Sequence, residues 1–512
     1  MKFFTLRFDV GLSDLRAPAL PLDFSAVIVL EVKSKNLDRQ YLNPPASSFK
    51  SWHVLLVNSM GNFMLGFMTT SINIAIPAIQ TELHLGAVAM GWLPLTYILA
   101  SAIFLLPLGR MADTWGRRRL FLLGMLLFTV SSLAMVFARS YVPLVGLRAG
   151  QGLGASLVFA GSTAMVTLAY PRERRGMAMG VAVAAAYLGQ TTGPAIGGVI
   201  VFHSGWRGLF IVAAAFGAFL VGLDLALLRR IEWREKAAGG FDVLGPVIYA
   251  PALASFLLGL SWLPQVKGIV LVFAGVVGLV MFVWWENRAR FPVIEIALFR
   301  HNRVFALSNI SALISYAAVW AMTFLMSLYL QFIKGLNPES AGLLLITGVA
   351  VQTAFSPFSG RLSDRIQPRW VASWGMGLCT VGLLMFSFLR GDTSYFYIVA
   401  VLCILGVGYA LFSPANQSSI MGSVERRNMG LASAAVATTR MVGMAISIGL
   451  ATLIMAVIVG RHDIMPADYP HLLTAIRITF GVLTALCAVG TVTSLVRGNL
   501  SLVRGTQVGE TP

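Results

Sequence analysis

Fourteen runs of mostly apolar residues fill the chain between residues 52 and 496, and the charged residues gather in the short segments between them. An apolar run of about 20 residues is long enough to cross a bilayer as an α-helix. We therefore predict fourteen membrane-spanning helices. They cover residues 52–78, 88–108, 119–138, 142–168, 177–201, 207–228, 243–263, 267–285, 304–332, 340–358, 370–389, 395–420, 430–459 and 472–496.

The segments between these runs alternate in basic content. Those after the second, fourth, sixth, eighth, tenth and twelfth runs carry clusters of Arg or Lys, such as residues 117–119 and 172–175. The intervening segments mostly hold a single basic residue or none. Basic loops stay on the cytosolic side of a membrane. We therefore predict a multi-pass protein of the cell (inner or plasma) membrane, with both termini in the cytosol.

The composition agrees with a membrane protein. The chain is 57% hydrophobic and 12% charged, whereas a soluble domain carries about 25% charged residues. The net charge of +17 lies largely in the basic segments, so we expect no nucleic-acid partner. We find no His/Cys ligand spacing, P-loop, H-E-x-x-H motif or Ser/His/Asp set, so we expect no metal site, no cofactor and no enzyme.

The chain repeats a short pattern. Residues Gly109–Asp113 and Gly360–Asp364 both read G-R-x-x-D. Two packed halves that rock about a midplane site are a common way to move a solute across a membrane. We predict an all-α integral membrane fold with two six-helix halves and two inserted helices. The predicted segments are an N-terminal cytosolic tail (1–50), a first half (51–230), the insertion (231–303), a second half (304–497) and a C-terminal cytosolic tail (498–512).

The repeated pattern also predicts a latch on the cytosolic face. Glycines suit a tight turn, and an Asp beside them can stabilise a helix N-terminus and pair with a nearby Arg. Such a cluster can hold the face closed in one state and release it in another; the alternative is a plain basic loop. The candidate latch residues are Gly109, Asp113, Gly116, Arg117, Gly360, Asp364 and Arg365.

Arg148 stands inside the fourth predicted helix, close to Gln151. An ionisable side chain within a span is costly and marks a functional position by default. We therefore expect Arg148 and Gln151 to take part in coupling, with Arg148 facing a cavity or a polar partner. The alternative is an Arg148 side chain that snorkels to the membrane surface.

The fifth predicted helix carries a stripe of small residues. Gly189, Gly193 and Gly197 recur at every fourth position, which places them on one face. Such a face lets helix backbones approach closely, and Pro194, which precedes Gly197 and Gly198, adds a bend. The thirteenth helix has a looser counterpart in Ala435, Thr439, Gly443 and Ser447. The stripe serves either motion between helices or tight packing alone.

These stretches resemble the major facilitator superfamily. The Gly109 segment is similar to the family's signature loop, and the Arg148 segment to its helix-4 motif. Residues 189–198 match the family's antiporter motif, G-x-x-x-G-P-x-x-G-G, without a gap. The fourteen spans and Phe241–Gly245 resemble its fourteen-helix drug:proton antiporter branch. The resemblance covers roughly residues 52–496 and implies alternating access, proton-driven export and several lipophilic substrates.

The sequence departs from that branch at Met68, where the branch has an Asp five residues before the Asn of N-x-A-x-P. We also find no carboxylate near the middle of any span. Proton coupling normally uses a buried acid or His, so its absence favours neutral or anionic substrates, with Arg148 or Arg440 as the partner of an anion. Polar candidates for the cavity, each also able to serve as an interhelical hydrogen-bonding residue, are Asn73, Tyr97, Tyr187, Gln190, Tyr316 and Asn416.

The predicted function is export of small lipophilic or drug-like molecules by alternating access, with proton antiport. The alternative is an exporter or facilitator of a specific neutral or anionic metabolite with weak or no proton coupling. The expected partners are the small-molecule substrate, protons and the lipid bilayer. In a cell with two membranes, an accessory periplasmic protein is a further expected partner.

Overall fold

The computed structural model describes residues 51–171, 174–229, 231, 242, 244–289, 292, 296–424 and 429–498. The regular elements within these ranges are helical, and thirteen of the helices are long and apolar enough to cross a membrane. The predicted tails over residues 1–50 and 498–512 lie outside the described residues, apart from Gly498. Their cytosolic placement therefore stays a prediction.

The longest helix, α6 (Arg175–Leu227), contains two of the predicted spans. Gly205 interrupts it with φ 65° and ψ 176°, a backbone conformation open to glycine and strained for other residues. The chain thus passes from the fifth span to the sixth through a single residue. Counting the two parts separately gives fourteen spans, which confirms the predicted number.

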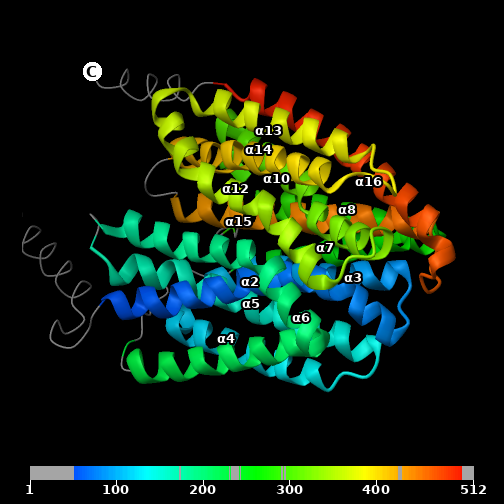
Figure 1. The fold of residues 1–512 in the computed structure, drawn as a ribbon. Helices are drawn as coiled ribbons and strands as arrows, with labels where there is room; N and C mark the ends of the chain where they lie inside the picture. Colours follow the sequence, from blue (N-terminus) through cyan, green and yellow to red (C-terminus); the bar gives the residue numbers. More distant parts are fainter. Residues whose placement is uncertain are drawn as a thin grey trace, which may run out of the picture. The chain divides into compact units, whose positions relative to one another are not determined.

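Two groups of helices make up the two halves, with an inserted pair between them in the sequence (Figure 1). The first half contains α2 (Ser51–Leu83), α3 (Ala87–Trp115), α4 (Arg117–Val136), α5 (Tyr141–Ala169) and α6. The insertion contains α7 (Leu244–Trp262) and α8 (Val266–Glu286). The second half contains α9 (Ile296–His301), α10 (Arg303–Val319), α11 (Ala321–Leu328), the π-helical turn η2 (Tyr329–Ile333), α12 (Pro338–Arg365), α13 (Pro368–Phe386), α14 (Tyr395–Gly422), α15 (Met429–Ile458), the short 3-10 helix η4 (Pro466–Asp468) and α16 (Tyr469–Val496).

The glycine stripe of α6 packs against α2. A Cβ atom at Gly189 would collide with the carbonyl oxygen of Phe63, and one at Gly193 would collide with the hydroxyl of Thr70. At Gly197 the added atom would lie 2.9 Å from the side chain of Ser71. The stripe therefore brings two backbones into contact, as small residues do between membrane helices, and it does not face lipid.

The counterpart stripe of α15 packs in the same way against the first long helix of the second half. A Cβ atom at Gly443 would lie 2.7 Å from the carbonyl oxygen of Leu313 in α10. The Ser447 hydroxyl accepts a hydrogen bond from the backbone N–H of Ala321, at 2.9 Å, just after the break between α10 and α11. Each half thus joins its first long helix to its fifth span through small residues.

The inserted helices form a hairpin, the α7–α8 hairpin. The carboxylate of Asp242 accepts hydrogen bonds from the backbone N–H of Leu244 at 3.0 Å and from the indole of Trp285 at 3.0 Å, so it ties the start of α7 to the end of α8. The hairpin also contacts both halves. The Tyr249 hydroxyl donates to a carbonyl of α3 at 3.4 Å, and Leu260 lies against α15.

The expectation that the latch glycines form a tight turn is wrong at Gly109 and Gly360, which lie within helices. Helix α3 continues to Trp115, and α12 likewise continues through Gly360 to Arg365. Only Gly116 turns the chain, with φ 109°, and a Cβ at Gly109 would meet no neighbouring atom. An apolar run predicts only the part of a helix that lies in lipid, and the helix itself can continue beyond that part.

Replacing Gly193 with Leu tests the packing of the stripe. The new side chain must displace α2, so we expect Gly193→Leu to lower the free energy of unfolding by about 1–3 kcal/mol, measured as a lower apparent Tm in detergent. Gly222→Leu is the matched control, because the same helix leaves open space at Gly222. Equal Tm values for the two variants would contradict the packing described above.

Candidate functional site

The two halves meet along two seams. Helix α6 lies against α12, and α3 lies against α15 (Figure 1). We call the end of the bundle that holds the junctions α3–α4, α5–α6 and α12–α13 the basic end, since Arg residues cluster there. The other end, at the α2–α3 and η2–α12 junctions, is the opposite end.

A proline creates one contact between the halves at the opposite end. Pro77 has no N–H, so the carbonyl of Asn73, four residues earlier, loses its helical donor. The hydroxyl of Ser327, in α11 of the other half, donates to this carbonyl at 2.6 Å. The amide of Gln331 donates to the next carbonyl, that of Ile74, at 3.2 Å and also to Ser327 at 2.9 Å. Asn73 thus acts through its backbone in a contact between the halves.

Further contacts join the halves at the same end. The Gln80 amide donates to the carbonyl of Ile464 at 3.4 Å, and Gly86 forms an isolated β-bridge with Asp463. A Cβ atom at Gly198 would lie 2.5 Å from the carbonyl oxygen of Pro338. The last two glycines of the α6 motif therefore serve different surfaces: Gly197 faces α2, and Gly198 faces the other half.

A pocket of about 420 Å³, including its open mouth, lies between the halves. We call it the Arg440 pocket. Its enclosed part, about 30 Å³, has room for about two water molecules, so a larger ligand would need the pocket to widen. Two of the predicted cavity residues, Tyr97 and Gln190, line it, and no acidic residue is among the described residues that do so. The lining residues are Gly66, Thr69, Tyr97, Ile98, Phe159, Ala186, Gln190, Trp320, Arg440, Met441 and Met444.

Arg440 is the charged residue of this pocket. It lies eleven residues into α15, about 16 Å along the helix, and therefore near the middle of a span. Its guanidinium carbon is 5.9 Å from the ring centre of Phe159, across the seam. Its Nε atom is buried and has no hydrogen-bond partner among the described residues.

Arg148 lies behind Tyr97, away from the membrane surface. Its side chain is fully buried, which excludes the snorkelling alternative. Its Nε donates to the carbonyl of Leu93 at 3.1 Å, and its NH1 donates to Gln151 at 2.6 Å. The guanidinium carbon also lies 4.8 Å from the ring centre of Tyr97. Arg148 and Gln151 are therefore brought together, in contact with a residue that lines the pocket.

Two further predicted cavity residues, Tyr187 and Tyr316, are not among the residues that line the pocket. Tyr187 directly follows the lining residue Ala186 in α6. The rings of Tyr316 and Tyr409 meet edge to face, with centroids 6.0 Å apart.

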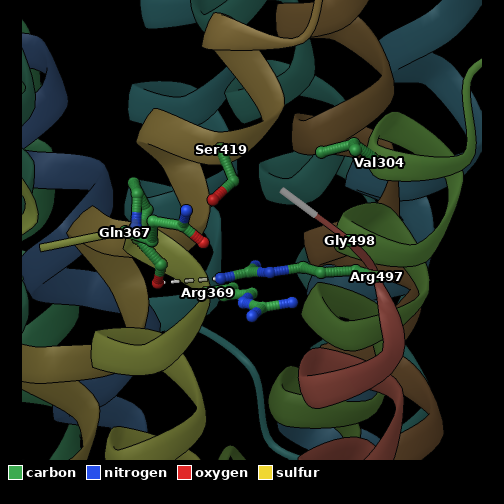
Figure 2. Close-up of a pocket in the computed structure, with 7 residues that line it drawn as sticks. Val304, Gln367, Arg369, Ser419, Arg497 and Gly498 are labelled. Carbon is green, nitrogen blue, oxygen red and sulfur yellow. Dashed lines mark hydrogen bonds between the residues drawn. The ribbon is translucent and has the colours of Figure 1, made fainter. Parts of the chain in front are cut away.

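Asn416 lies elsewhere, beside a second, smaller pocket at the basic end. Its carbonyl oxygen accepts from Arg497 NH1 at 2.6 Å, and its amide donates to the carbonyl of Ser308 at 3.1 Å. Arg497 NH2 also donates to the carbonyl of Pro368 at 2.9 Å, a bond that Figure 2 marks with a dashed line. Asn416 and Arg497 thereby fasten the ends of α14, α16 and α13 to one another.

The predicted latch segments lie at the basic end, but the side chains of Asp113 and Asp364 fall outside the described part of the structure. The neighbouring Arg118 is buried and pairs with Asp224 of α6 at 2.7 Å. Arg117 begins α4, directly after the turn at Gly116, and Arg365 is exposed at the end of α12. Whether these residues act as a latch stays a prediction.

Several residues of these sites were not predicted as such. Ser327 and Gln331 act on helix α2, which precedes them by about 250 residues, and no local pattern connects the two segments. Arg118 and Asp224 are likewise distant in sequence. The N-x-A-x-P motif was the available signal for the contact at Asn73, because a proline in a span predicts a free carbonyl four residues earlier.

Removing the Ser327 hydroxyl should weaken the contact at the opposite end. A buried hydrogen bond contributes about 1 kcal/mol, so Ser327→Ala should raise the population of separated halves about fivefold. Pulsed EPR distances between spin labels at the exposed positions His84 and Ala467 would measure this. Ser315→Ala is the control, because the Ser315 hydroxyl has no partner among the described residues. An unchanged distance distribution in Ser327→Ala would contradict the role of this bond.

Known proteins with similar sequences include several resistance and transport proteins. The chain is 32% identical over 406 residues to the multidrug resistance protein Stp of Mycobacterium tuberculosis, covering 78% of this chain and 74% of Stp. It is 28% identical over 400 residues to the riboflavin transporter RibZ of Clostridioides difficile, covering 78% and 86%. It is 27% identical over 429 residues to the tetracenomycin C resistance and export protein of Streptomyces glaucescens, covering 82% and 79%.

Solved structures share the fold. A bacterial homologue of the human lysosomal transporter Spinster, in an inward-facing and unoccupied conformation, matches with a TM-score of 0.64 and 14% identity, over 87% of this chain and 96% of that one. The nucleoside transporter NupG matches with a TM-score of 0.59 and 12% identity, over 87% and 99%. The family model of the Major Facilitator Superfamily matches residues 59–448 and 308–504. The chain therefore belongs to the Major Facilitator Superfamily and is a membrane transporter, not an enzyme.

Proposed function

We propose that this transporter exports small lipophilic, drug-like molecules by alternating access. The observation that carries the proposal is the Arg440 pocket, which both halves line in the middle of the spans. A midplane site shared by two halves is what a rocking motion needs in order to expose a substrate to each side in turn. The names of two relatives, a multidrug resistance protein and a tetracenomycin C resistance and export protein, support drug-like substrates.

The proposed orientation places the basic end in the cytosol, in the plasma or inner membrane. The Arg clusters at that end support it, because positively charged loops are retained on the cytosolic side. The contacts of Ser327, Gln331 and Gln80 then close the outward side.

The latch proposal concerns the basic end. There the buried pair of Arg118 and Asp224 holds the start of α4 against α6, next to the segment that contains Asp113. In the proposed cycle the first copy of G-R-x-x-D engages the other half when the cytosolic side closes. The second copy, with Asp364, does the same from its own half.

Changing Asp113 to Asn should slow transport several-fold while leaving the protein folded and inserted, because the amide lacks the charge that pairs with Arg and with a helix N-terminus. Transport rates in liposomes and the detergent Tm would be measured together. Asp392→Asn, at an exposed loop of the opposite end, is the matched control. A normal rate in Asp113→Asn would rule out the latch.

Proton antiport is the proposed coupling, and two observations favour a second candidate. Among the described residues, no carboxylate lines the pocket, and Met68, the position of the branch's Asp, is fully buried in α2. These features favour export or facilitated passage of a specific neutral or anionic metabolite with weak or no proton coupling. The name of a third relative, a riboflavin transporter, agrees with this candidate.

Purified protein in liposomes with a trapped pH-sensitive dye would test both candidates. A gradient of a cationic, a neutral or an anionic compound would be imposed, and proton movement and substrate flux would be followed. We expect flux with proton counter-movement for at least one compound, and none in protein-free liposomes. Flux without proton movement would replace antiport by the second candidate. An absence of flux for every compound of the panel would contradict export of drug-like molecules.

A further inference from the structure

The guanidinium of Arg440 is the feature of the central pocket that the proposed function leaves without a task. Its Nε atom is buried and has no hydrogen-bond partner among the described residues, and its guanidinium carbon lies 5.9 Å from the ring centre of Phe159. A charge held in the middle of a membrane span is costly unless it meets a partner. Arg148, in contrast, donates hydrogen bonds from two of its nitrogen atoms, to the carbonyl of Leu93 and to Gln151.

The charges around the pocket have one sign. Arg440 lines it, and Arg148 lies directly behind the Tyr97 ring. Glu82 and Asp224, two acidic residues of the first half, lie near the ends of their helices. A pocket lined by one cation, with a second cation behind its wall and no acid among the described lining residues, attracts an anion and repels a cation.

The rest of the lining is suited to a flat apolar body. Phe159 and Trp320 contribute aromatic faces, and Met441 and Met444 contribute flexible thioether side chains that adapt to different shapes. Tyr97 has a buried hydroxyl without a hydrogen-bond partner among the described residues. The pocket thus offers one cation, one free hydroxyl and several aromatic or sulfur-containing surfaces.

Arg440 also occupies a particular place in the repeat. It directly follows Thr439 of the α15 stripe, as Pro194 directly follows Gly193 of the α6 stripe. In α6, Pro194 leaves the carbonyl of Gln190 without its helical donor. The Thr70 hydroxyl of α2 donates to this carbonyl at 3.0 Å. In α15 the equivalent position places a cation in the pocket. At this position the second half therefore has Arg440, which lines the pocket, whereas the first half has Pro194, which allows α6 to bond to α2.

We infer that the Arg440 pocket binds flat aromatic anions, with the acidic group on the Arg440 guanidinium and the ring system against Phe159 and Trp320. A guanidinium can donate two parallel hydrogen bonds to a carboxylate, or one charged hydrogen bond to a phenolate. Its hydrogen bonds to a neutral analogue are weaker. The inference rests on the proposed transport function and specifies its substrate class.

Three ligands with one ring system would test it. 2-Naphthoate, 2-naphthamide and 2-naphthylmethylammonium carry a negative, a neutral and a positive group on the same naphthalene body. Their equilibrium binding to the purified protein in detergent would be measured by calorimetry. We expect the wild-type protein to bind 2-naphthoate at least about tenfold more tightly than 2-naphthamide, since charged hydrogen bonds are the strong ones, and to bind the ammonium most weakly. Equal affinities, tighter binding of the ammonium, or no binding of 2-naphthoate would overturn the inference.

Substitutions at Arg440 test whether this residue causes the preference for 2-naphthoate over 2-naphthamide. Arg440→Gln should abolish the preference for 2-naphthoate over 2-naphthamide, whereas Arg440→Lys should keep part of it, because the charge remains while the planar fork is lost. Retained binding of 2-naphthamide shows that the pocket of Arg440→Gln is intact. Arg477→Gln, at an exposed position of α16, is the matched control and should leave all three affinities unchanged. A full preference in Arg440→Gln, or its loss in Arg477→Gln, would refute the assignment.

The same ligands separate this inference from the proposed function. Binding in detergent requires no movement of the halves, whereas flux into liposomes does. Binding of 2-naphthoate that depends on Arg440, without flux, would support the ligand class and count against transport. Flux of 2-naphthoate that does not depend on Arg440 would support transport and refute the ligand class.

Discussion

Within the hydrocarbon layer a backbone carbonyl without a donor costs several kcal/mol, and Pro77 and Pro194 each leave one carbonyl without its helical donor. The two free carbonyls are those of Asn73 and Gln190. The hydroxyl of Ser327 satisfies the first, and the hydroxyl of Thr70 satisfies the second. One bond joins the two halves, and the other joins α2 to α6 inside the first half. Helix α2 is thereby fixed on both sides by the same physical requirement.

Much of the fold follows from sequence patterns because lipid imposes a simple rule on each span. The fourteen spans and the small-residue stripe at Gly189, Gly193 and Gly197 are features of single helices, which a local pattern contains. Hydropathy does not measure helix length outside the membrane, and therefore α3 continues to Trp115 beyond its predicted end. Pairs such as Arg118 with Asp224, or Arg497 with Asn416, depend on which helices become neighbours. That information lies in the assembled bundle and not in any one segment.

The candidate site was also predictable only in part from the sequence. Tyr97 and Gln190 were recognisable as polar residues within spans, and they line the pocket. Asn416 has the same local character but lies at the end of the bundle, where it fixes Arg497. A polar residue in a span must find a partner, but the sequence does not say whether that partner is another helix or a ligand.

The α7–α8 hairpin makes the two seams of the protein unequal. Through Tyr249 and Leu260 it contacts α3 and α15, the two helices that form one seam. The seam between α6 and α12 has no inserted hairpin of this kind among the described elements. A hydrophobic molecule that approached from the bilayer would therefore meet the inserted hairpin at the α3–α15 seam but not at the α6–α12 seam.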